Sequence, residues 1–439
     1  MRIPPHRRLR LANGMRLVLL PRSDVPLIAC EAVVRGGARL DPPQRAGLAS
    51  MTAEMLTRGA GSRDAFAFSD AVEGAGGSLD AAAHAEAVLL HAQFLARDRA
   101  LMLELLADAL QRARLEAGEL ERVRERRIEF IKAAKDSEPQ SLIGNYGRAM
   151  LFAGHPFASP VAGSERSLAA IVTEDLQRYY REHVGADRTT LVFAGDFDAD
   201  EFQSELQAVF GGWRSAGSAL PPLAAPARTR GRRVRLIDAP DSTQSYFWIG
   251  QRGVARSFPD RAALDITNTA FGGSFGSMLM QTLRVRHGLT YSAGSSFRRA
   301  SVPGEFAISS FTQAESTREA LDLTLATLDE LKRAGAGERA IDSARSYILG
   351  QYPMNLETAA DWAAALADLD LYELPDAYID EYAGALHGVD LERSRQVIAG
   401  AFPDSGDIDI VLIGDADRVR GQVAGLGALS ESALAAPDY

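Results

Sequence analysis

The sequence predicts an α+β fold made of two homologous domains, each a largely antiparallel sheet packed with helices. Three observations indicate this fold: the chain repeats itself once, tight-turn signals separate its strand-like runs, and long helical patterns follow those runs. The 439 residues are also too many for a single hydrophobic core. Sequential strands joined by tight turns favour antiparallel pairing, with helices covering the sheet.

The elements of the first half can be assigned in order. Residues 11–20 contain Asn-Gly beside apolar runs, which predicts a hairpin. Cys30, the only cysteine, lies in the next apolar strand; we expect it in the core, and a single cysteine excludes an intrachain disulfide. Helical patterns then dominate, notably at residues 98–114 and 118–134. The half closes with a buried-type strand at residues 191–196 that ends in Gly-Asp.

The second half repeats these features. Residues 251–259 resemble residues 34–42, in each case a strand that leads through a turn into a helix. Residues 410–415 resemble residues 191–196, so the two matches are offset by 217 and 219 residues. The near agreement of the offsets predicts two equivalent domains.

The stretch between the repeats is rich in Pro, Ser, Gly and Ala and has no periodicity. Such a composition is typical of a linker, and its prolines favour an extended conformation. We therefore predict domains at residues 1–214 and 234–439, joined by a linker at residues 215–233.

Charge and hydropathy exclude several classes of partner. The formal net charge of −10 does not provide the broad cationic face that binding to nucleic acid needs. No stretch approaches the roughly 20 apolar residues of a membrane span, and no signal peptide is visible. We expect a soluble protein, cytoplasmic or periplasmic in a bacterium.

A series of short motifs follows in one order along nearly the whole chain. They are residues 35–39 (Arg-Gly-Gly-Ala-Arg), 76–81 (Gly-Gly-Ser-Leu-Asp-Ala), 155–157 (His-Pro-Phe), 179–180 (Tyr-Tyr), 271–277 (Phe-Gly-Gly-Ser-Phe-Gly-Ser) and 283–292 (Leu-Arg-Val-Arg-His-Gly-Leu-Thr-Tyr-Ser). Together these motifs resemble the pitrilysin/insulinase family of zinc metallopeptidases in its two-domain, processing-peptidase-like form. The resemblance implies that the chain forms half of a clam-shaped chamber.

The chain departs from this family at the zinc motif. H-x-x-E-H places two imidazoles at i and i+4 on a helix, with a glutamate that takes a proton from metal-bound water. The equivalent positions here hold Ser50, Ala53 and Glu54. Without the resemblance, this segment reads as an ordinary amphipathic helix. The family's third ligand falls near Glu129 and Phe130, and our alignment gives its place to Phe130. We expect no metal site in this chain.

The second half retains a pair that the family uses in catalysis. The spacing R-x-x-x-G-L-x-Y is present with Arg284 and Tyr291. The resemblance implies that these side chains reach into a zinc site, where both can donate hydrogen bonds to a developing oxyanion. We expect Gly288 to end the helix after Arg284, and Tyr291 to begin a strand. The alternative for the pair is structural, an arginine capping a helix and a tyrosine in a sheet.

The resemblance also implies two substrate-binding elements. The glycine-rich loop with Gly272, Gly273 and Ser274 would lie beside the substrate channel, although a purely structural turn is an alternative; it lacks the Lys-Ser/Thr of a phosphate-binding loop. An edge strand with Ala81 and Ala82 would pair with extended peptides by β-augmentation. We place His84 and Glu86 on the same face of that strand.

These features predict an inactive subunit of a heteromeric zinc metalloendopeptidase, a heterodimer or larger. The zinc is expected in a homologous partner, while this chain contributes Arg284 and Tyr291 to hydrolysis of peptide substrates. The alternative is a peptide-binding or scaffold protein that retains the chamber and has no hydrolytic role.

Overall fold

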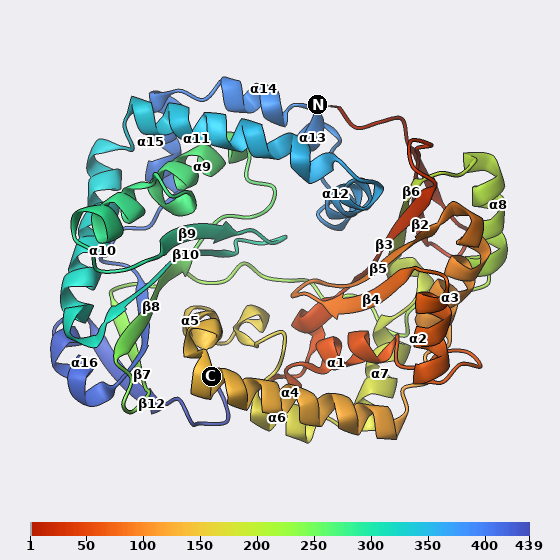
Figure 1. Ribbon diagram of the computed structural model, residues 1–439, viewed down its shortest axis with the longest axis horizontal. Helices are drawn as coiled ribbons and strands as arrows, with labels where there is room; N and C mark the ends of the chain where they lie inside the picture. The colour runs from red at the N-terminus through yellow and green to blue at the C-terminus, as the bar shows by residue number, and fades with distance from the viewer. Residues whose placement is uncertain (1) are drawn as a thin grey trace.

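The computed structural model describes residues 2–439 and contains two six-stranded sheets (Figure 1). The first sheet has the order β1-β2-β6-β3-β5-β4. Its strands are β1 (Arg7–Arg10), β2 (Arg16–Pro21), β3 (Leu27–Arg35), β4 (Ser78–Ala83), β5 (Ala87–Leu95) and β6 (Thr189–Gly195). The β1–β2 pair forms the predicted hairpin, and only the β2–β6 pair is parallel.

The second sheet has the order β12-β7-β11-β8-β10-β9. Its strands are β7 (Arg233–Asp238), β8 (Gln244–Arg252), β9 (Ala293–Arg298), β10 (Glu305–Gln313), β11 (Asp409–Gly414) and β12 (Ala428–Ala433). The order β7-β11-β8-β10-β9 matches β2-β6-β3-β5-β4 strand for strand, and the matched β7–β11 pair is again parallel. The predicted repeat and the α+β class are confirmed.

Helices surround both sheets. In the first half they are α1 (Leu48–Met55), α2 (Ala65–Gly74), α3 (Arg99–Gln111), α4 (Ala117–Ser137), α5 (Ile143–Leu151), α6 (Glu165–Ala170), α7 (Thr173–His183) and α8 (Ala199–Phe210). In the second half they are α9 (Arg261–Asn268), α10 (Thr317–Ala334), α11 (Glu338–Gln351), α12 (Ala359–Leu371), α13 (Ala377–Asp380), α14 (Tyr382–His387), α15 (Leu391–Ala401) and α16 (Ala416–Val423). Within residues 2–439, no helix combines the length and apolar character that crossing a bilayer requires.

Each sheet packs one face against a helix from the other half of the sequence. Helix α12 lies on β3 and β6 of the first sheet, where Trp362 and Leu366 are buried. Helix α5 lies on β8 and β11 of the second sheet, where Tyr146 is buried against Trp248 and its neighbours. A fully buried apolar side chain contributes about 1.5–3 kcal/mol, so this exchange of helices holds the halves together.

One glycine permits the close contact between α5 and the second sheet. A Cβ on Gly147 would lie 2.5 Å from an indole carbon of Trp248. The absence of a side chain therefore lets the helix backbone approach the ring.

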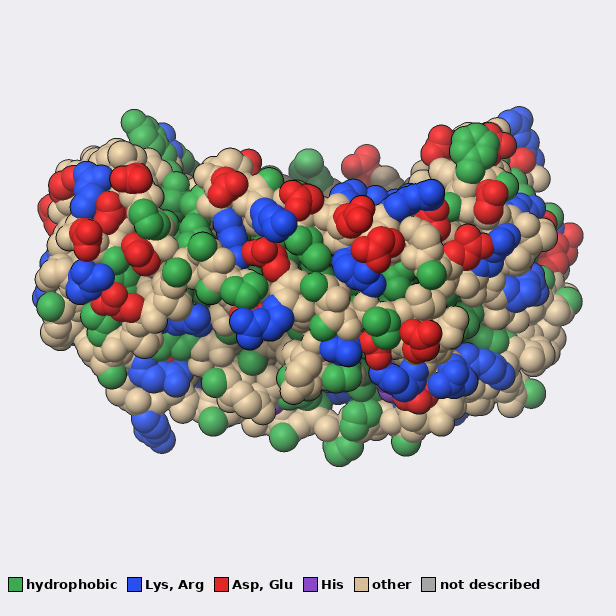
Figure 2. All heavy atoms as spheres, turned by 90° about the horizontal axis from the view of Figure 1, so that it is seen from below, with side chains coloured by type: hydrophobic (Ala, Val, Ile, Leu, Met, Phe, Trp, Pro, Cys, Tyr) green, Lys and Arg blue, Asp and Glu red, His purple; other side chains and the backbone are tan. Residues whose placement is uncertain are grey.

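The overall shape is the one expected for one half of a clam-shaped chamber. The two sheets lie on opposite sides of the molecule, with α12 and α5 between them (Figure 1). Figure 2 shows both ends of the molecule rising above its middle, which makes the outline concave on one side. On the face in Figure 2, basic and acidic side chains are intermingled. The predicted linker overlaps a stretch without helix or strand, residues 211–232. Helices α5 and α12 each pack on the sheet of the other half, so the packing crosses the predicted domain limits. Those limits stay a prediction.

Candidate functional site

Helix α1 holds the positions of the predicted zinc motif. Its first turn is fixed by Asp41, whose carboxylate accepts from the backbone N–H groups of Gly47 and Ala49, both at 2.9 Å. Burial raises the pKa of Asp41 to about 8. The helix buries Leu48, Met51 and Met55, as its amphipathic pattern predicts, and this leaves Ser50 and Glu54 on the opposite side.

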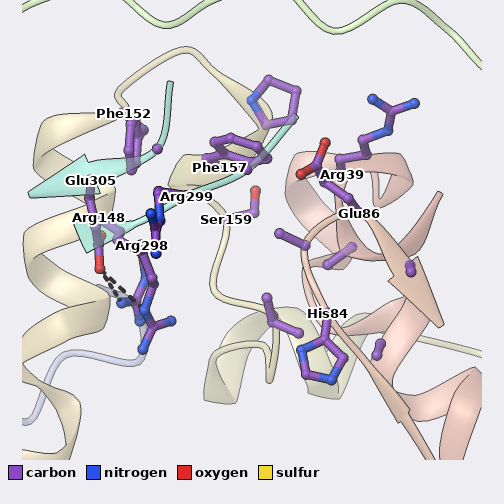
Figure 3. Close-up of a pocket in the computed structure, with 18 of the residues that line it drawn as sticks. Arg39, His84, Glu86, Arg148, Phe152, Phe157, Ser159, Arg298, Arg299 and Glu305 are labelled. Carbon is purple, nitrogen blue, oxygen red and sulfur yellow. Dashed lines mark hydrogen bonds and ion pairs between the residues drawn. The ribbon is translucent and has the colours of Figure 1, made fainter. Parts of the chain in front are cut away.

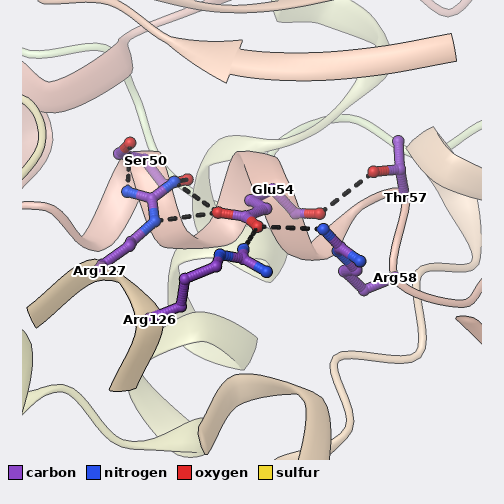
Figure 4. A network of polar contacts seen from close by, with 6 residues as sticks. All are labelled: Ser50, Glu54, Thr57, Arg58, Arg126 and Arg127. Carbon is purple, nitrogen blue, oxygen red and sulfur yellow. Dashed lines mark hydrogen bonds and ion pairs between the residues drawn. The ribbon is translucent and has the colours of Figure 1, made fainter. Parts of the chain in front are cut away.

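The guanidinium of Arg127, from α4, lies between Ser50 and Glu54 (Figure 4). Its Nε and Nη2 donate to Oε2 of Glu54 at 2.9 and 2.8 Å, and its Nη1 donates to Oγ of Ser50 at 2.8 Å. Arg126 also binds Glu54, and Nη2 of Arg58 lies 3.4 Å from its Oε1. An organic cation thus joins the two helix positions where H-x-x-E-H carries imidazoles.

The expectation that Phe130 takes the place of the third ligand is wrong. Phe130 is 74% exposed, and Glu129 forms its ion pair with the exposed Lys132. Arg127 faces α1 because the residues four positions before and after it, Val123 and Ile131, are buried. The sequence contained this signal in the spacing of apolar residues along the helix.

The side chains at this position do not fit a zinc ion. Ala53 has no donor atom, and the oxygens of Ser50 and Glu54 already accept from guanidinium groups. Zinc sites in proteins use imidazole, thiolate and carboxylate donors that are free to coordinate. Among residues 2–439 no group of three or more His, Cys, Asp or Glu residues is arranged to hold a metal.

Arg284 and Tyr291 lie together at the surface of the second half. Arg284 is in the last turn of a π-helical segment, and Gly288 ends that segment with φ +64°. Nη1 of Arg284 donates to the backbone carbonyl of Tyr291 at 3.0 Å. The Tyr291 side chain is 78% exposed. Tyr291 does not begin the strand as expected; it lies in the bend before β9, which frees its ring from the sheet.

A residue that sequence reasoning missed completes this cluster. The Phe275 ring is 63% exposed, and Cζ of Arg284 lies 4.9 Å from its centroid and 6.0 Å from that of Tyr291. A cation over an aromatic face is attracted by the ring quadrupole. The guanidinium is therefore oriented by two rings and a carbonyl. The only signal in the sequence was an aromatic residue inside a glycine-rich loop.

The glycine-rich loop packs directly behind β9. A Cβ on Gly272 would lie 2.4 Å from Oγ of Ser295, so this position accepts no side chain. A Cβ on Gly273 would lie 3.3 Å from Oγ1 of Thr269, and Ser274 donates to the carbonyl of Thr269 at 3.3 Å. The close packing accounts for the glycine at 272; a contact between this loop and substrate stays a prediction.

Ala81 and Ala82 lie in β4, the edge strand of the first sheet, where β5 is their only neighbour among the described strands. The placement of His84 and Glu86 on this strand is wrong. The strand ends at Ala83, because the chain turns there to pair with β5. Glu86 is buried and accepts from the backbone N–H of Ser301 at 2.9 Å, across the two halves.

Comparisons with known proteins agree with this architecture. Residues 17–165 match the family model described as insulinase (peptidase family M16), and residues 170–348 match the model described as peptidase M16 inactive domain. The chain is 26% identical to an uncharacterized zinc protease of Mycobacterium leprae over 365 residues. The aligned region covers 83% of this chain and 82% of that protein.

Two further likenesses extend the comparison. Human cytochrome b-c1 complex subunit 1 is 27% identical over 265 residues, which is 60% of this chain and 54% of that protein. The crystal structure of a peptidase M16 inactive domain from Pseudomonas fluorescens superposes with a TM-score of 0.87 at 22% identity, over 94% of this chain and 98% of that chain. The two family matches and the two-sheet architecture together show that this chain belongs to the insulinase family of peptidases, family M16.

Proposed function

We propose that this chain is the zinc-less, non-catalytic subunit of a heteromeric zinc metalloendopeptidase. One observation carries the proposal. The Arg127 guanidinium binds Ser50 and Glu54, the two helix positions where the zinc motif has histidines. Arg284 and Tyr291, in contrast, lie side by side at the surface. The first half has lost the donors that a metal needs, and the second half presents two hydrogen-bond donors of the kind that peptide hydrolysis uses.

Arg284 and Tyr291 would act on the negative charge that develops on the substrate. No ion pair involves Arg284 among residues 2–439, and one of its N–H groups is used by the Tyr291 carbonyl, so other donors remain free. The exposed phenol of Tyr291 is a further donor. Zinc, bound by a homologous partner subunit, would supply an activated water. The two donors of this chain would stabilise the oxyanion formed when that water attacks a peptide carbonyl.

Peptides would bind in extended form. The free edge of β4, with the small side chains of Ala81 and Ala82, supports pairing with an added strand. The loop of Gly272, Gly273 and Ser274 packs on β9 and leads directly into Phe275, whose ring faces Arg284. The substrate would thus be held between backbone edges, and small side chains would let it approach.

The proposal is tested by reconstitution with a homologous chain that carries H-x-x-E-H. We expect this chain alone to hydrolyse no peptide and to contain no stoichiometric zinc by mass spectrometry, and the mixture to be active. Arg284→Ala or Tyr291→Phe should lower kcat of the mixture by about 10²-fold, the usual effect of one lost oxyanion donor. Arg286→Ala is the matched control, because Arg286 is exposed two residues away and outside the pair.

A scaffold or peptide-binding role is the second candidate. It is supported by the likeness to the human cytochrome b-c1 subunit, a component of a larger complex by its name. Normal assembly with unchanged kcat in both variants would favour this role and reject ours. One tight zinc per chain, or turnover by this chain alone, would also reject ours.

A further inference from the structure

A crevice of about 610 Å³ lies between the two halves of the chain (Figure 3). One wall comes from the turn between β4 and β5. The other comes from α5 and from the connection between β9 and β10. Neither the Arg284 pair nor the α1 positions line it. Its volume is in the range of small-ligand sites in proteins.

The second wall carries more positive than negative charge. Arg148 and Arg298 both face Glu305, with nitrogen–oxygen distances of 3.5 and 3.4 Å. These contacts are too long for strong hydrogen bonds. Nη2 of Arg148 also donates to Oδ1 of Asn145 at 2.8 Å, and within residues 2–439 the other N–H groups of the two guanidiniums have no further acceptor. Arg299 lines the same wall and is paired behind it with Asp265 at 3.0 Å. Figure 3 shows the three arginines clustered on this side of the crevice.

The first wall does not neutralise this charge. The Glu86 carboxylate accepts from the backbone N–H and the hydroxyl of Ser301 and keeps its negative charge, but Arg39 on the same wall carries the opposite charge. Among residues 2–439 Arg39 forms no ion pair, and its Nη2 donates to the Pro221 carbonyl at 3.3 Å. Burial and the positive charges of His91 and Arg298 hold the pKa of His84 below its ordinary value.

The crevice is also suited to an extended, partly apolar chain. Phe152 and Phe157 form an apolar part of the lining, with ring centroids 5.8 Å apart. The edge strand β4 runs into the crevice at Ala83, and the edge strand β9 reaches it at Arg298. A peptide that pairs with either edge is directed into the crevice at one of its ends.

We propose that this crevice binds the carboxyl terminus of a short peptide. Its carboxylate would lie among Arg148, Arg298 and Arg299, because hydrogen bonds between a guanidinium and a carboxylate are stronger than those between neutral groups. Its last side chain would lie against Phe152 and Phe157. The site goes beyond the function proposed above, because it lies within this chain and needs neither a partner nor a metal.

The full chain alone is sufficient for the test. Calorimetry would compare acetyl-Ala-Ala-Ala-Phe with a free carboxylate, the same peptide as its amide, and acetate. We expect the free acid to bind at least tenfold more tightly than either of the others. Arg298→Gln should weaken the acid about tenfold and leave the amide unchanged. Arg298 is 72% exposed, so the fold should tolerate the change, and Arg97→Gln, at an 80% exposed side chain outside the crevice, is the matched control.

Nuclear magnetic resonance gives a second readout at His84. Bound carboxylate would raise the pKa of His84 toward or above its ordinary value, and the amide would not. Equal affinity for acid and amide, or an Arg298→Gln variant that binds the acid normally, would overturn the proposal. Acetate that binds as tightly as the peptide would overturn the assignment to a peptide. None of these results bears on the reconstitution experiment, so failure of one proposal is distinguishable from failure of the other.

Discussion

Glu54→Gln should destabilise the protein although the substitution keeps the size of the side chain. Glu54 is 18% exposed and, within residues 2–439, is the only acidic group bound by the Arg127 guanidinium. Its two-pronged contact with Arg127 is worth about 1.5–3 kcal/mol. Arg126 and Arg58 are 54% and 41% exposed, so solvent screening leaves about 0.3–0.5 kcal/mol for each. The free energy of unfolding should fall by about 2–4 kcal/mol.

Thermal unfolding followed by circular dichroism at neutral pH measures this change. For domains of about 200 residues, Tm should fall by roughly 4–16 °C. Glu129→Gln is the matched control: it removes the same charge from α4 at a 70% exposed side chain paired only with Lys132, and should change the free energy by less than about 0.5 kcal/mol. If the two variants melt at the same temperature, Glu54 does not hold α1 to α4, and the description of Arg127 as the cation that fills the former metal position would be refuted.

Three further predictions concern the same half and the loop of the second half. Restoring H-x-x-E-H within residues 50–54 should give no tight zinc binding while Arg127 remains, because its positive charge stays between the new imidazoles; adding Arg127→Glu should raise the zinc content measured by mass spectrometry. Burial raises the pKa of Asp41 from 3.8 to about 8, so the folded state holds a proton that the unfolded state has lost. Stability should therefore fall as pH rises from about 4 to 8, and Asp41→Asn should flatten the profile of urea midpoints. Gly272→Ala should cost about 1–3 kcal/mol in urea unfolding, because its Cβ would meet Ser295, whereas Gly276→Ala meets nothing within 4 Å and should be neutral.

The sequence was sufficient for features that depend on local patterns. The hairpin at residues 11–20 follows from Asn-Gly between apolar runs, and the repeat follows from strands that end in the same way in both halves. The missing zinc ligands at Ser50, Ala53 and Glu54 were visible because a helical metal motif has a fixed spacing. The neighbourhood of Arg284 and Tyr291 was likewise predictable, since a single turn at Gly288 brings them together.

Small errors arose where a chain segment ends. The sequence pattern continued β4 through His84 and Glu86 and began β9 at Tyr291, whereas β4 ends at Ala83 and β9 begins at Ala293. Strand ends are decided by pairing with a neighbour, which the residues of one strand do not specify.

By itself, then, the sequence determined the two-domain repeat, the α+β class and the loss of imidazole ligands, because hydrophobic period, turn chemistry and motif spacing act over a few residues. Only the tertiary structure decided that Arg127 fills the space between Ser50 and Glu54, that α5 and α12 pack on each other's sheets, and that a cationic crevice lies between the halves. These features join segments from 70 to more than 300 residues apart. Their positions depend on which faces of helices and sheets pack together, and that choice is made by the folded chain as a whole.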